Sequence, residues 1–402
     1  MIEPAGPVPH TGPVPHARPV PRVAPAPRPA GLFASLRRRD QRTTAELYLA
    51  ALLATDGRKS VRNLSTAFGA GAGAAEQRLH HFVAGSTWDW RPVRGALVDA
   101  LGAAVPRHAW VVRALPIPKA GTHSVGVDRQ YVPGAGRQVH GQLAFGLWFV
   151  SAHLTAPVGW RLFLPPRWLD DAERRARADV PASAVPESPG ECAARAALPF
   201  AARGAGARPP VVVGHVVDDP AAVVDVFARA GVPFVARIDV RTRLVAADRE
   251  GAGAGGRPAR AEQVLRSAPG PRRPVERPDP SRGRRTSWLA ATPVRLPDRP
   301  RPLLLLGEWD DPRHPPVRLW LTDATDTPAP LLVRLTASAL RVPDDGGPWG
   351  ARVGLRDFEG RSFPGWHRHM TLASVAYALA AGARDLSAQA DAGPAQSLRP
   401  SA

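Results

Sequence analysis

A helix predicted over 74–83 contains side chains that could contact DNA bases. It follows a predicted helix over 60–68 and a glycine-rich turn over 69–73, an order typical of a helix-turn-helix, in which the second helix enters the major groove. Its polar side chains include Gln77, Arg78, His80 and His81. A plain three-helix cap on a larger domain explains the same pattern, so both interpretations stay open.

Basic residues near these helices and further along the chain complete the expected DNA contacts. Arg58 and Lys59 come just before the first of the two helices, where their charges could neutralise phosphates. The full set of candidate DNA-binding residues is Arg58, Lys59, Gln77, Arg78, His80, His81, Lys119 and Arg129.

The charge of the chain favours a polyanionic partner, with nucleic acid as the first candidate. The sequence has 53 Lys and Arg against 35 Asp and Glu, a net charge of +18. Lysine occurs only at Lys59 and Lys119, and Ala, Gly and Pro are abundant, so a GC-rich coding sequence explains part of the arginine excess. Charge alone therefore also fits a solvated basic surface without a partner.

Cysteine and histidine give no pattern for a metal site. Cys192 is the single cysteine, which excludes an internal disulfide and a multi-cysteine metal site. His367 and His369 are two residues apart, and on a helix such side chains point in different directions. We therefore expect these histidines to pack or to contact DNA.

Composition divides the chain into segments. We expect a disordered Pro-rich tail over 1–36, a helical domain over 37–105, an α/β domain over 106–385 with a flexible Gly/Pro/Arg-rich segment at 249–285, and a frayed tail over 386–402. No run of 18 apolar residues and no secretory signal is visible. A cytoplasmic, nucleoid-associated protein is the expectation.

The α/β segment shows four apolar strand patterns, followed by helices that alternate with two further strands. The predicted strands cover 110–115, 124–130, 138–150, 160–164, 210–214 and 234–239, and the predicted helices cover 170–178, 191–201 and 218–231. Such an order is expected of an RNase H-like mixed sheet flanked by helices, behind an N-terminal helix-turn-helix-like domain.

Four ordered motif blocks resemble a known family. They are Trp88-Asp89-Trp90-Arg91-Pro92-Val93, His123-Ser124-Val125-Gly126-Val127 with Arg129-Gln130-Tyr131, Trp160-Arg161-Leu162-Phe163-Leu164-Pro165, and Phe358-Glu359-Gly360-Arg361-Ser362 with Gly365-Trp366-His367. Together they resemble insertion-sequence transposases of the DDE superfamily endonuclease type, and the resemblance runs from about Arg37 to Leu379. We expect Trp88, Trp90, Trp366 and Tyr377 to be core residues.

The resemblance implies three acidic residues on an RNase H-like fold that hold two Mg²⁺ or Mn²⁺ ions for phosphodiester cleavage. At the matching positions this sequence has Arg113, Gly214 and Pro343. Arg113 would place a fixed cation where two dications should lie. The run from Pro343 to Pro348 cannot continue a helix, because one proline costs about 3 kcal/mol in a helix interior.

Acids near these positions leave an alternative open. They are Asp128, Asp218, Asp219, Asp344, Asp345 and Glu359. Asp219 is placed to cap a helix, and Asp344 and Asp345 precede two glycines, as turn residues do.

The sequence thus predicts a transposase-like protein that binds double-stranded DNA, needs no cofactor and does not cleave strands; a homodimer stays open. One alternative is an active transposase that uses displaced acids. The other is a non-functional product that folds poorly.

Overall fold

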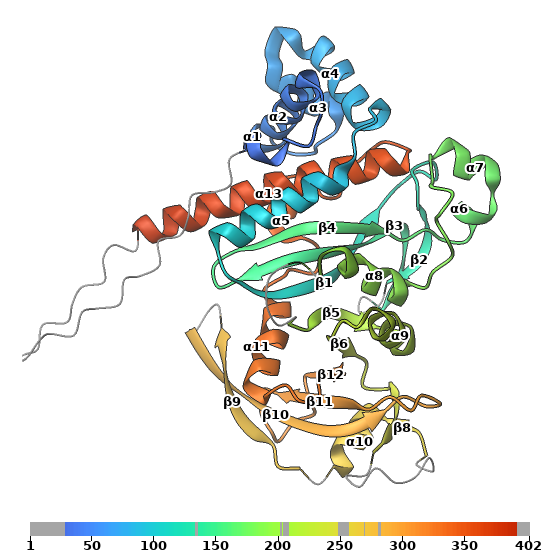
Figure 1. Cartoon of the computed structure of the whole chain (residues 1–402), viewed down its shortest axis with the longest axis vertical. Coiled ribbons are helices and arrows are strands. Elements are labelled where there is room, and N and C mark those ends of the chain that lie inside the picture. Colours follow the sequence, from blue (N-terminus) through green and yellow to red (C-terminus); the bar gives the residue numbers. More distant parts are fainter. Residues whose placement is uncertain are drawn as a thin grey trace, which may run out of the picture.

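The computed structural model describes residues 29–132, 136–201, 203, 209–247, 257–268, 270–279 and 283–391. Within these ranges, no helix is long and apolar enough to cross a membrane. Figure 1 shows a group of helices at one end, a sheet in the middle and a strand-rich part at the other end.

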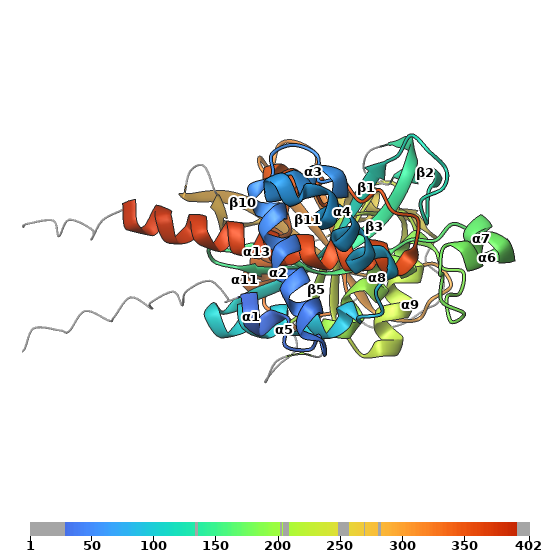
Figure 2. The ribbon, with the colours of Figure 1, turned by 90° about the horizontal axis from the view of Figure 1, so that it is seen from above.

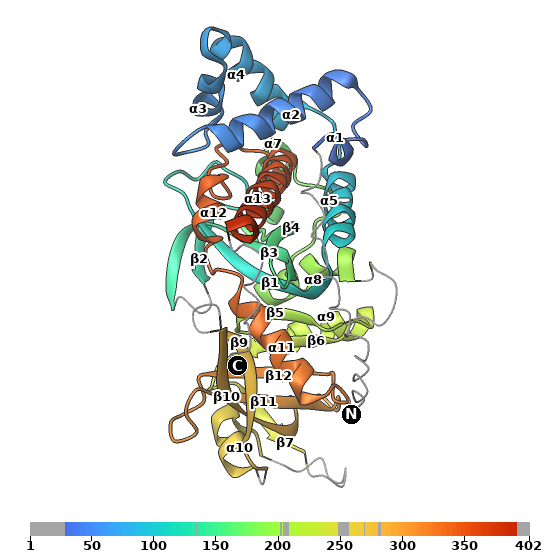
Figure 3. The same cartoon turned by 90° about the vertical axis from the view of Figure 1, so that its left-hand side faces the viewer.

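The N-terminal helices pack around buried leucines and lie over the C-terminal helix (Figures 2 and 3). They are α1 (Pro29–Leu32), α2 (Arg39–Ala54), α3 (Val61–Ser65), the 3₁₀ helix η1 (Thr66–Gly71), α4 (Ala72–His80), the π-helix η2 (His81–Gly85) and α5 (Trp90–Ala104). Leu52, Leu64 and Leu79 form their shared interior. The side chain of Ser60 accepts the Asn63 N–H at the start of α3, which explains why a helix begins there.

Helical structure begins before residue 36, where the sequence analysis placed the end of the disordered tail. Residues 1–28 lie outside the described residues, but α1 begins at Pro29. Leu32, Phe33 and Leu36 are buried, and burying three large apolar side chains offsets the entropy of ordering this short segment.

The first strands form the antiparallel half of a mixed sheet. They are β1 (Arg107–Pro118), β2 (Asp128–Val132), β3 (Arg137–Ser151) and β4 (Thr155–Leu162), and β3 pairs antiparallel with the other three. Short helices α6 (Arg167–Asp170) and α7 (Ala172–Arg177) follow, and then α8 (Pro189–Ala201).

The chain then adds two parallel strands. The elements are β5 (Val211–Val217), α9 (Pro220–Ala230) and β6 (Phe234–Ile238). β5 pairs parallel with β1, and β6 pairs parallel with β5, which gives the order β4-β3-β1-β5-β6. Antiparallel strands followed by helix-connected parallel strands confirm the predicted RNase H-like mixed sheet.

Strands from 243 to 322 extend the same sheet beyond β6. They are β7 (Arg243–Ala246), β8 (Ala259–Arg260), β9 (Arg273–Asp279), β10 (Gly283–Arg295), β11 (Leu303–Trp309) and β12 (Arg318–Thr322), with α10 (Ala261–Ser267) between β8 and β9. β12 pairs antiparallel with β6 and so joins these strands to the RNase H-like part.

The described residues of the segment over 249–285, which the sequence predicts to be flexible, form regular elements. Residues 257–268, 270–279 and 283–285 belong largely to β8, α10, β9 and the start of β10; the remainder lies outside the described residues. Pro274 and Pro278 did not prevent a strand, because β9 pairs on one side, with β10, and an edge strand tolerates a missing N–H.

Three helices follow β12 in the described part of the chain. They are α11 (Ala329–Leu340), α12 (Gly347–Arg352) and α13 (Phe363–Asp391), and Pro343 lies between α11 and α12. α13 continues past the predicted frayed boundary at 386, and residues 392–402 lie outside the described residues. α11 and the pair α8 and α9 lie on different sides of β5 (Figure 1).

Candidate functional site

The side chain of Arg113 lies at the junction of β1, β5 and the end of α11. It is 6% exposed. Its Nη1 donates to the Gly214 carbonyl at 2.6 Å, and its Nη2 donates to the carbonyls of Ala339 and Val342, both at 3.0 Å. Trp110 to Val112 pair with Val211 to Val213, so Arg113 and Gly214 are the next positions on the two strands. Two of the three predicted positions therefore meet directly.

Because Gly214 has no side chain, Arg113 and α11 can pack directly against it. A Cβ at this position would lie 3.1 Å from the Ala339 Cβ and 3.2 Å from the Arg113 Nε, closer than comfortable van der Waals contact. Ala339 is the α11 side chain that faces this junction, one helical turn before Pro343. The sequence did not identify Ala339, because its place depends on how α11 packs across β1 and β5.

Charged groups around Arg113 are mostly cationic. Asp344 Oδ1 lies 2.7 Å from the Arg113 Nη1, but the Asp344 side chain is 85% exposed. Burial lowers the pKa of Arg113, the Asp344 charge raises it, and the charges of Arg237 and Arg318 lower it. Arg237 and Arg318 come from β6 and β12, so the pairing of these strands brings them near.

The other candidate acids are engaged elsewhere. Asp128 pairs with Arg167 at 3.0 Å, Asp345 with Arg356 at 3.4 Å, and Glu359 with Arg58 at 3.0 Å. The carboxylate of Asp219 accepts the Ala222 N–H and caps α9, as the sequence predicted.

Asp218 lies beside Asp219, and burial followed by the charge of Asp239 raises its pKa. Across the described part of the chain, no three His, Cys, Asp or Glu side chains gather where they could hold a metal ion.

Residues 31–295 match the family model described as DDE superfamily endonuclease. The chain belongs to this family. No curated protein matches it closely. The match extends from α1 to the end of β10, so it includes Arg113 and Gly214, whereas α11 and Pro343 lie beyond it.

Four of the predicted DNA-binding residues of this DDE superfamily member lie together on an open surface. Gln77, Arg78, His80 and His81 are exposed on α4 and the first residue of η2. Figure 1 shows α4 at the outer end of the molecule, away from the sheet. The turn before α4 contains Gly69 with φ of +55°, a conformation that favours glycine. Arg129 is exposed on β2, at a separate place.

Three of the predicted DNA-binding residues contact the loop over 356–361, Lys59 through its backbone and Arg58 and Lys119 through their side chains. The side chain of Lys59 is buried, its Nζ donates to the Thr55 carbonyl, and its backbone N–H donates to Asp357 at 2.8 Å. Lys119 Nζ donates to the Phe358 carbonyl at 2.6 Å, and burial lowers the pKa of Lys119 to about 8. Arg58 pairs with Glu359 in the same loop. The phosphate contact expected of Lys59 conflicts with the burial of its side chain. The apolar stem of this side chain packs against Gly354.

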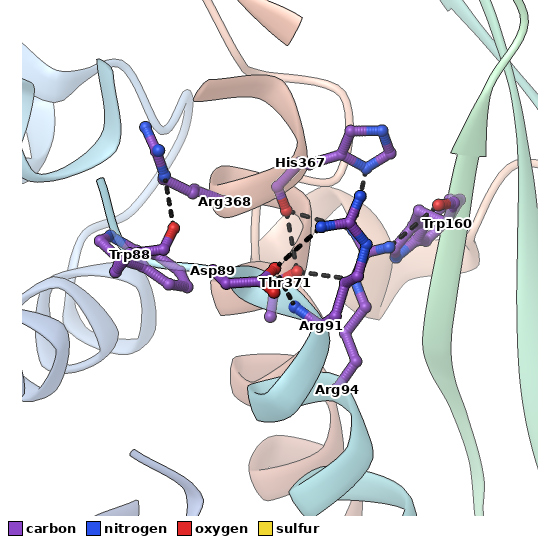
Figure 4. Close-up of polar contacts among 8 residues, drawn as sticks. All are labelled: Trp88, Asp89, Arg91, Arg94, Trp160, His367, Arg368 and Thr371. Atoms are coloured by element: carbon purple, nitrogen blue, oxygen red, sulfur yellow. Dashed lines mark hydrogen bonds and ion pairs between the residues drawn. The ribbon is translucent and has the colours of Figure 1, made fainter. Parts of the chain in front are cut away.

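Residues of the Trp88, Trp160 and Trp366 motif blocks meet at a buried arginine (Figure 4). Arg94, on α5, donates to the Thr371 hydroxyl at 2.7 Å, to the Trp160 carbonyl at 2.9 Å and to the His367 carbonyl at 3.2 Å. The His367 ring stacks on Trp90 with centroids 4.8 Å apart. These motif residues thus join α5, β4 and α13.

A second arginine of α13 fixes the chain before α5. Arg368 Nε donates to the Trp88 carbonyl at 3.1 Å, and its Nη1 donates to the Val83 carbonyl at 3.0 Å. The expectation that Trp88, Trp90, Trp366 and Tyr377 are core residues is confirmed, since all four are buried. The family motifs at this place therefore build the interior.

Stability is expected to fall as pH falls, because three buried histidines are neutral in the folded chain. Burial lowers the pKa of His215 to about 3 and that of His369 to about 4, and it lowers that of His367 well below its ordinary value. An unfolded histidine has a pKa of about 6.5. The unfolded state thus binds protons first, and stability is lost progressively from about pH 6.5 toward pH 4.

Urea unfolding across this pH range measures the effect. His369→Gln should flatten the dependence of the unfolding free energy on pH, because burial lowers the pKa of His369 to about 4 and glutamine takes up no proton in either state. The exposed His80→Gln is the control and should keep the wild-type slope. Equal slopes in all three proteins would contradict the assignment.

Proposed function

We propose that this member of the DDE superfamily endonucleases binds double-stranded DNA and does not cleave it. The observation that supports this most is the Arg113 guanidinium, which lies between the β1 and β5 strands and the end of α11. We infer that this junction is the family's catalytic place, with Arg113 and Gly214 at two of its acidic positions.

Electrostatics argues against divalent metal ions at this junction. Mg²⁺ and Mn²⁺ select anionic oxygen ligands. Here the facing groups are a guanidinium, a glycine, an alanine and the Asp344 carboxylate, which already contacts Arg113. The residues present therefore do not fit a pair of divalent metal ions.

The DNA half of the proposal rests on charge and on α4. The net charge of +18 favours a polyanion. Arg78 is exposed beside Gln77, and His80 lies one residue after the buried Leu79, so α4 has one face in the interior and a polar face in solvent. We propose that α3, η1 and α4 act as a helix-turn-helix whose α4 enters the major groove. The insertion-sequence origin, the homodimer and the nucleoid location stay predictions.

Charge reversal on α4 tests DNA binding. Arg78→Glu should weaken binding to duplex DNA about tenfold and reduce the slope of log affinity against log salt by about 1, because one phosphate contact is lost. Fluorescence anisotropy in a salt series measures both quantities.

The matched control is Arg229→Glu, an equal charge change at an exposed position of α9. It should leave affinity within about twofold of wild type, as a surface site outside the contact does. Equal losses in both variants would show that binding follows net charge and would overturn the role of α4. An absence of any salt dependence would overturn DNA binding itself.

A further inference from the structure

A cavity of about 650 Å³ lies between α11, the beginning of β1, the β3–β4 turn and β9. It is on the side of α11 that includes Arg334 and Arg341, whereas Ala339 faces the Arg113 junction. Its lining residues are Arg107, His108, Ala152, Arg277, Leu331, Arg334, Leu335, Ala337, Ser338, Leu340 and Arg341. A volume of this size matches sites that enclose small organic molecules.

The ionisable lining groups are all basic. Arginines come from β1, β9 and α11, and none of the described residues that line the cavity is Asp or Glu. Arg277 is neutralised by Glu308 at 2.9 Å. Arg334 is exposed and makes no ion pair within the described residues. The field in the cavity is therefore positive.

Contacts already fix two of these cations. The Arg107 guanidinium lies over the Trp110 ring, 4.5 Å from its centroid, and donates to the Arg203 carbonyl at 3.4 Å, toward the end of α8. Arg341 donates to the Ser151 carbonyl. His108 is exposed, and partial desolvation, followed by the charges of Arg341 and Arg334, lowers its pKa, so His108 is a neutral donor or acceptor near pH 7. Leucine and alanine side chains supply apolar walls between these polar groups.

We propose that this cavity binds a small amphipathic organic anion, with a carboxylate, sulfonate or phosphate on the arginines and an apolar body against the leucines. The planar guanidinium of arginine can donate two parallel hydrogen bonds to such planar or tetrahedral anions. This site lies beyond the proposed DNA contact on α4 and does not depend on it.

Titration with 8-anilino-1-naphthalenesulfonate, followed by fluorescence, tests the site. Wild type should bind the dye saturably at one site. Arg334→Glu should weaken dye binding at least tenfold, because it reverses a charge at the anion. Ala337→Phe should abolish binding by filling the cavity. Arg229→Glu, on α9, should bind as wild type does.

Thermal unfolding of each variant must show a wild-type midpoint, which excludes dye binding to a loosened fold, and duplex DNA affinity should stay unchanged in Arg334→Glu. Equal dye binding in Ala337→Phe and wild type would overturn the site. Displacement of the dye by duplex DNA would also overturn it, because the cavity would then belong to the DNA interface.

Discussion

Arg113→Met is expected to lower the free energy of unfolding by about 3 kcal/mol. The substitution keeps an apolar side chain of similar length but removes the donors to three buried carbonyls, those of Gly214, Ala339 and Val342. A buried acceptor left without its partner costs about 1–3 kcal/mol. Urea unfolding monitored by tryptophan fluorescence measures the change.

Two variants separate the carbonyl contacts from the ion pair. Asp344→Asn should cost less than about 1 kcal/mol, because Asp344 is exposed and a surface ion pair contributes little. Arg129→Met, at an exposed arginine of β2, should lie within about 0.5 kcal/mol of wild type. If Asp344→Asn proved as harmful as Arg113→Met, the carbonyl contacts would not be what holds the end of α11.

Arg94→Met is expected to cost about 4 kcal/mol, the largest loss among the variants considered. Arg94 is 5% exposed and bonds to Thr371, Trp160 and His367 from two other elements. Hydrogen bonds to a charged group contribute about 1.5–3 kcal/mol each, and they are not fully additive. Urea unfolding again gives the value.

Arg91→Met is the matched control, because Arg91 lies one helical turn earlier on α5 and is exposed beside Asp89. It should change the unfolding free energy by less than about 0.5 kcal/mol. Arg94→Lys should recover little, since an ammonium cannot reach all three partners as the planar guanidinium does. A loss below about 1 kcal/mol for Arg94→Met would contradict the structural role of the motif residues.

The sequence predicted the mixed sheet well, because its buried strands are long apolar or β-branched runs such as Val211 to Val213. It failed at 249–285, where Gly, Pro and Arg suggested a loop. Tertiary pairing decided this segment: among the described residues β9 pairs with β10 on one side, and an edge strand tolerates prolines. Local composition contains no signal of that pairing.

The candidate site was predicted in part. The family resemblance picked out Arg113 and Gly214, and these residues lie on neighbouring parallel strands. The approach of Ala339, Arg237 and Arg318 could not be predicted, because it depends on the packing of α11 and on the pairing of β6 with β12. The burial of Lys59 could not be predicted either, because a lysine next to a turn gives no sequence signal of burial.

Incubation of the full-length protein with supercoiled plasmid and Mg²⁺ or Mn²⁺, read on one native gel, tests the central claim most directly. The proposal predicts a mobility shift that weakens with salt, and plasmid recovered fully supercoiled after protein removal, with or without metal. Metal-dependent nicking that disappears in Asp344→Ala or Asp219→Ala would contradict it and would show that displaced acids perform the family's chemistry.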